Sequence, residues 1–99
     1  MENYVAVVPK DLVDLVPVFL KNRKADATEL EHALESLDLA KVKELGERIY
    51  ALGVPYGFRH LTTLGREIQD AAKARNVEAL RGSIRAYADY VARVQVDYQ

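Results

Sequence analysis

From residue 11 almost to the C-terminus, apolar residues recur at spacings of three and four. This spacing places them on one stripe of an α-helix, which gives each segment one face for a core and one for solvent. Alternation with a period of two, which would indicate strands, is not sustained over a useful length. The short apolar stretch from Tyr4 to Val8 suits either a strand or an arm lying on the domain, and Pro9 ends it. The pattern therefore predicts an all-α protein.

Capping and turn residues divide this pattern into helices. Asp11 is expected to cap a short first helix, and Pro17 to lie in the first turn of a longer one. A break at Ser36-Leu37-Asp38 follows, with Asp38 as the cap of the next helix. Gly53 is expected to stand just past the end of that helix, because glycine is favoured there.

The rest of the chain adds two more helices. Pro55-Tyr56-Gly57 indicates a turn before the third helix, and Asn76 is expected to cap the last one. The tail from Val96 to Gln99 is expected to be frayed. Four main amphipathic helices with short loops predict an antiparallel up-down four-helix bundle with a short N-terminal helix or arm. Residues 1–99 are expected to form a single domain, because only chains of a few hundred residues divide into several.

The predicted core is one apolar stripe from each main helix. The hydroxyl group of Tyr87 is expected at the rim of this core. The residues of the four stripes are Val16, Phe19, Ala27, Leu30, Leu34 and Leu37; Val42, Leu45, Ile49 and Leu52; Leu61, Leu64, Ile68, Ala71 and Ala72; and Val77, Leu80, Ile84, Tyr87, Val91 and Val94.

Composition excludes several classes of function. A net charge of −1 and a pI near 6.1 argue against a nucleic-acid or membrane-surface protein. No apolar run approaches the roughly 20 residues of a membrane span, and the N-terminus lacks the basic start of a signal peptide. The absence of cysteine excludes disulfides and thiolate metal sites, and it fits a cytoplasmic protein. So small a chain has little room for a deep enzyme pocket beside its core.

The histidines do not form a recognisable catalytic or metal site. Glu29 and His32 have the E-x-x-H spacing of di-iron bundles, but that chemistry needs the motif twice, and His32 points away from the apolar stripe. His60 has no readable nucleophile partner. Arg23 lies on an apolar stripe, so its guanidinium is expected to reach the bundle end or a carboxylate such as Asp26, with a partner contact as the less favoured alternative. We expect no catalytic residue, metal or cofactor.

The helix from Asp38 carries an unusual outward face. At about 100° per residue, Glu47 points almost opposite the apolar stripe. The residues on its outward side are Lys43, Tyr50, Ala51 and Val54. A carboxylate among apolar groups suggests a docking surface. The alternative is an ordinary solvent-exposed face, because single exposed apolar residues are common.

Residues 45–58, LGERIYALGVPYGF, resemble the signature of histidine-phosphotransfer (HPt) domains. In that family the helix reads roughly Gly-His-x-x-Lys-Gly-x-Gly, and Tyr-Gly-Phe follows after a short loop. Residues 16–23 and 64–72 are similar to neighbouring helices of bacterial members, so the resemblance extends almost end to end. It implies a four-helix bundle that docks with receiver or histidine kinase domains in two-component phosphorelays.

The chain departs from the family at the reactive position. Glu47 stands where the family has its phosphorylated histidine, Tyr50 replaces the usual lysine, and Ala51 replaces a glycine. A carboxylate cannot replace imidazole in a phosphorelay, because it offers no neutral nitrogen nucleophile near pH 7. The resemblance therefore implies a non-enzymatic HPt-like domain that docks to a receiver or histidine kinase without carrying phosphate.

Two alternatives stay open. One is an active phosphotransfer protein that uses a non-standard residue, and the other is a purely structural or dimerising helical bundle. Under the docking reading, the partner-binding residues are expected to be Lys43, Glu47, Tyr50, Ala51 and Val54, with Tyr50 as the aromatic anchor. The protein is expected to be a cytoplasmic monomer or weak dimer.

Overall fold

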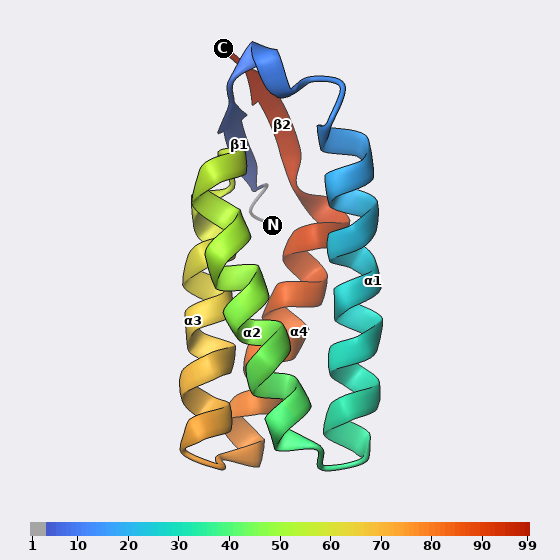
Figure 1. Ribbon diagram of the computed structural model, residues 1–99, viewed down its shortest axis with the longest axis vertical. Helices are drawn as coiled ribbons and strands as arrows, with labels where there is room; N and C mark the ends of the chain where they lie inside the picture. Colours follow the sequence, from blue (N-terminus) through green and yellow to red (C-terminus); the bar gives the residue numbers. More distant parts are fainter. Residues whose placement is uncertain (1–3) are drawn as a thin grey trace.

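A computed structural model describes residues 4–99 of the chain. Its longest elements are four α-helices that lie side by side (Figure 1). They are α1 (Val16–Glu35), α2 (Leu39–Gly53), α3 (Arg59–Lys73) and α4 (Val77–Arg93). The smaller elements are two short helical turns, η1 (Lys10–Leu12) and η2 (Val54–Tyr56), and two strands, β1 (Val5–Val8) and β2 (Gln95–Tyr98). The prediction of a mainly helical protein with four main helices is confirmed, and the small sheet is an addition to it.

The helix starts follow the capping residues in the sequence, with one exception. The Asp38 carboxylate accepts a hydrogen bond from the backbone N–H of Lys41 at 3.1 Å, and the Asn76 side chain caps α4 in the same way. Pro17 lies in the first turn of α1. The expected cap at Asp11 is wrong, because Asp11 lies inside η1 and its side chain caps nothing.

The two ends of the chain pair with each other. β1 and β2 form a parallel ladder in which Val5 lies opposite Gln95 and Val8 opposite Tyr98. The stretch after Tyr4 is therefore a strand, and its alternate side chains are buried. The expected frayed tail is wrong, because a strand partner some ninety residues earlier in the chain holds it. At the end of the ladder, the Gln99 N–H donates to the Val8 carbonyl at 2.9 Å.

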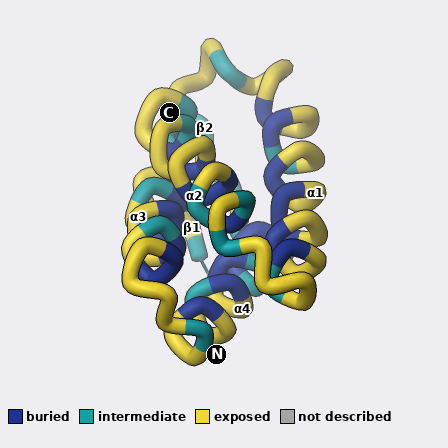
Figure 2. Tube along the Cα trace, turned by 60° about the horizontal axis from the view of Figure 1, so that its bottom comes forward, coloured by how far each residue is buried: buried dark blue, intermediate teal, exposed yellow. Residues whose placement is uncertain are grey.

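The core lies along the inward sides of the four helices, which are dark blue in Figure 2. Most of the predicted stripe residues are buried, but Leu37 is 63% exposed because it occupies the left-handed turn after α1 with φ 54°. The sequence also missed core positions outside the stripes, among them Phe58 and Tyr90. Four predicted core residues are only half-buried: Leu34, Leu52, Val77 and Val94.

The expected position of the Tyr87 hydroxyl group, at the rim of the core, is wrong. The Tyr87 side chain is fully buried, and its hydroxyl group does not reach the rim of the core. The hydroxyl donates a hydrogen bond of 2.8 Å to the backbone carbonyl of Arg23 in α1. A buried phenol needs such a partner, because an unpaired buried polar group is costly.

Glycines allow the backbones of α2 and α3 to approach closely. A Cβ atom on Gly65 would lie 2.9 Å from the Gly46 carbonyl oxygen and 2.9 Å from the Tyr50 Cα. A Cβ atom on Gly53 would lie 2.7 Å from the Phe58 carbonyl oxygen. Gly53 is therefore not the residue past the helix end that the sequence suggested. It is the last residue of α2, with helical φ of −62°, and the left-handed turn residue is Gly57 with φ 87°.

We predict that Gly65→Ala destabilises the protein, because the new methyl group would meet the backbone of α2. Overpacking of this kind costs about 1–3 kcal/mol of unfolding free energy. The matched control is Gly82→Ala in α4, where an added Cβ meets nothing within 4 Å. That change should stabilise the protein by about 0.5–1 kcal/mol through helix propensity. Urea unfolding of both variants tests the pair, and equal effects would contradict the close α2–α3 contact.

We predict that two buried tyrosines, Tyr87 and Tyr90, make the folded protein less stable in alkaline solution. Burial raises the pKa of Tyr90 to about 12 and raises the pKa of Tyr87 well above its ordinary value. An unfolded chain loses these protons near pH 10, so stability is complete below about pH 10 and falls as the pH rises further. In this range, each tyrosine lowers the free energy of unfolding by up to about 1.4 kcal/mol per pH unit. Urea unfolding across this range should show a clearly smaller slope for Tyr90→Phe, and an unchanged slope would contradict the assignment.

Candidate functional site

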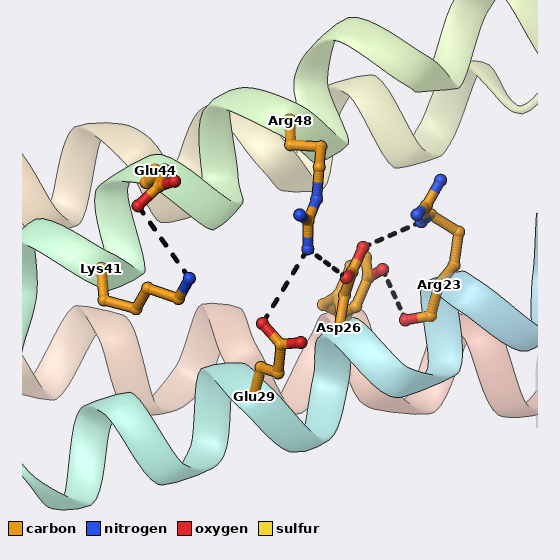
Figure 3. A network of polar contacts seen from close by, with 7 residues as sticks. Arg23, Asp26, Glu29, Lys41, Glu44 and Arg48 are labelled. Atoms are coloured by element: carbon orange, nitrogen blue, oxygen red, sulfur yellow. Dashed lines mark hydrogen bonds and ion pairs between the residues drawn. The ribbon is translucent and has the colours of Figure 1, made fainter.

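A partly buried polar network joins α1 to α2 (Figure 3). Asp26 in α1 is 3% exposed and accepts hydrogen bonds from two guanidinium groups. The Nε of Arg23 lies 2.8 Å from one carboxylate oxygen, and the Nη2 of Arg48 lies 2.6 Å from the other. The expected contact between Arg23 and Asp26 is therefore confirmed. The sequence does not indicate the role of Arg48, because its position suggests only a solvated residue. Arg48 also lies 3.9 Å from Glu29.

This network fixes the position of α2. Arg48 directly follows Glu47, so its bond to Asp26 anchors the helix next to the residue at the centre of the outward face. Charge-assisted hydrogen bonds are stronger than neutral ones, and a buried carboxylate without its partners would be very costly. The outward face of α2 is therefore presented on a fixed backbone.

The five residues predicted for docking lie on the outer side of α2 and η2. The Nζ of Lys43 is 3.5 Å from the Oε1 of Glu47, and both side chains are nearly half exposed. Tyr50 is 41% exposed and Val54 is 55% exposed. Ala51 is also exposed. Together they present a carboxylate paired with an ammonium group beside an aromatic ring and two aliphatic groups.

α3 contributes two residues that the sequence did not point to. The Arg66 guanidinium carbon lies 5.9 Å from the centre of the Tyr50 ring, within the range of a cation–π contact. The Thr62 hydroxyl donates to the Tyr50 carbonyl and accepts from the Val54 N–H, both at 3.0 Å. These contacts support the end of α2 and the Tyr50 side chain. They join two helices, so no local spacing in the sequence indicates them.

Neither histidine joins this face. His32 is exposed, as expected. His60 lies against the rings of Tyr4 and Tyr90, with ring centres 5.8 Å and 5.0 Å away. Within residues 4–99, no group of three or more histidine, aspartate or glutamate side chains is placed to hold a metal ion.

Comparison of the chain with protein-family models, with curated proteins and with solved structures gives no match. In the described part of the chain, no helix has the length and apolar character needed to cross a membrane.

We predict that Asp26→Ala lowers the free energy of unfolding by about 3–5 kcal/mol, because it leaves Arg23 without its partner in a buried site. The control is Glu44→Ala on α2. Glu44 forms an exposed pair with Lys41 at 4.0 Å, and its loss should change stability by less than about 0.5 kcal/mol. Thermal and urea unfolding measure both variants, and a small effect at Asp26 would show that the network does not anchor α2.

Proposed function

We propose that the chain is an HPt-like docking domain of a bacterial phosphorelay that binds a receiver or histidine kinase domain without carrying phosphate. The observation that carries the proposal is the exposed Glu47 carboxylate, which stands at the family's phosphohistidine position on an otherwise HPt-like helix. The proposed docking face consists of Lys43, Glu47, Tyr50, Ala51 and Val54. The proposal places the protein in the cytoplasm, where receiver domains function.

The proposal includes the antiparallel up-down topology of an HPt-like bundle. Short connections support it, since only a few residues separate each of the four helices from the next. Contacts of α1 with both α2 and α4, and of α3 with both α2 and α4, support a closed arrangement around one core.

The chemistry of the face favours binding over phosphoryl transfer. Glu47 has no imidazole nitrogen to accept a phosphoryl group, and its charge is partly neutralised by Lys43. The lysine of the family pattern is replaced by Tyr50, whose ring is supported by Arg66. Supported, half-exposed aromatic residues are typical anchors of protein interfaces. Glu47 imitates a phosphohistidine poorly, because a carboxylate has less charge and fewer acceptor oxygens than a phosphoryl group.

The test measures binding of the full chain to purified receiver and kinase dimerisation domains from its source organism. We expect Glu47→Arg to weaken the best of these interactions by at least about tenfold, since reversed charges at an interface cost over about 1.4 kcal/mol. Glu78→Arg is the matched control, because it makes the same charge change on α4, where the Glu78 side chain is 90% exposed. Equal loss in both variants would contradict the assigned face.

Tyr50→Ala tests the aromatic anchor separately. We expect weaker binding, with a thermal midpoint close to that of the natural protein, since the ring is 41% exposed. A large loss of stability would instead make Tyr50 a structural residue.

Incubation with a phosphorylated receiver distinguishes the alternatives. We expect no phosphate on the chain, and transfer to any residue would favour the active relay instead. A stable dimer in sedimentation, combined with no binding to any receiver or kinase domain, would favour the structural bundle.

A further inference from the structure

A second surface lies between the start of α1 and the end of α2. It is a groove of about 280 Å³ whose α1 side is formed by Leu15, Val18 and Phe19. Leu52 and Tyr56 form the opposite side. Leu15 is 52% exposed and Val18 is 60% exposed, so the groove is open and its rim is apolar. Its size is close to the lower end of small-molecule sites.

Arg23 is the only charged residue that lines this groove within the described chain. The residue is 7% exposed, and its guanidinium carbon lies 5.0 Å from the centre of the Phe19 ring. Only Nε is used in the hydrogen bond to Asp26. Neither terminal nitrogen takes part in that bond, and the Tyr87 hydroxyl is a further polar group close to the guanidinium.

The Arg23 side chain is not fully enclosed, because 9% of its surface is exposed. No buried side-chain nitrogen or oxygen of residues 4–99 is left without a hydrogen-bond partner, so unpartnered atoms cannot be fully enclosed. Arg23 lines the groove, and its guanidinium lies over the ring of Phe19, which lines the same groove. Figure 3 shows one terminal nitrogen of Arg23 pointing away from Asp26.

Arg23 shares its carboxylate partner, Asp26, with a second guanidinium group. Asp26 carries one negative charge and serves two guanidinium groups, those of Arg23 and Arg48. Glu29, the other acid of the network, lies 3.9 Å from Arg48 and is half exposed. An anion in the groove would therefore complete the pairing of Arg23 in a setting with little water to screen it.

We propose that this groove binds a small apolar molecule that carries one carboxylate. The two terminal nitrogens of a guanidinium match the two oxygens of a carboxylate, and the groove offers no second cation for a phosphate dianion. The apolar part of the ligand packs against Leu15, Val18 and Tyr56, and the Asn22 amide at the groove adds a neutral polar contact.

The site is distinct from the proposed docking face. Leu52 is two residues from Tyr50, or about 200° around the helix, so the groove and Tyr50 lie on different sides of α2. The inference therefore does not depend on the proposed function, and either can fail alone.

The test is an NMR titration of the full, isotope-labelled chain with octanoate, and with octanamide as a neutral molecule of the same shape. We expect saturable shifts at the Arg23 Nε–H and at the backbone amides of Val18 and Asn22. Octanoate should bind at least about tenfold more tightly than octanamide, a difference of about 1.4 kcal/mol. Octylammonium, which carries the opposite charge, should not bind at this site.

A surface variant avoids disturbing the buried network. Val18→Glu places a carboxylate at the groove rim and should weaken octanoate binding several-fold. Val18→Gln is the neutral control, and this variant should bind octanoate more tightly than Val18→Glu does. Equal affinity of the natural chain for octanoate and octanamide would overturn the contact with Arg23. The absence of saturable shifts at the groove up to about 10 mM octanoate would overturn the site itself.

Discussion

The close contact between α2 and α3 is the constraint on which the rest of the structure depends. Gly46 and Gly65 bring the two backbones together, and Gly53 continues the contact to the end of α2. At this separation the side chains of α3 reach the carbonyl and N–H groups at the end of α2, as Thr62 does. Interiors are closely packed, so a single methyl group at Gly65 would force the helices apart.

α1 holds α2 from a second side by a different kind of interaction. There the contact is ionic, with the Asp26 carboxylate shared between Arg23 on its own helix and Arg48 on α2. A glycine contact fixes distance, and a shared buried carboxylate fixes which turn of one helix faces which turn of the other. With two sides of α2 occupied, the third side, with Glu47 and Tyr50, is left for solvent or a partner.

The same arrangement gives the molecule two surfaces of different character. The face around Glu47 carries both charges and a half-exposed aromatic ring, which suits another protein. The groove at Arg23 is small and apolar with one cation, which suits a small anion. Arg23 belongs to both the core network and the groove, because only one of its donor groups is needed by Asp26.

The sequence by itself determined the helices, since their periodicity and their caps at Asp38 and Asn76 are local. It also indicated the outward side of α2 and the pairing of Arg23 with Asp26, because residues three apart share a helix face. Only the tertiary structure decided the rest. The β1–β2 pairing, the Arg48–Asp26 bond and the support of Tyr50 by Arg66 join residues distant in sequence. Gly53 shows the physical reason: the sequence marks a glycine, and only the neighbouring helix reveals that the glycine serves close packing rather than a turn.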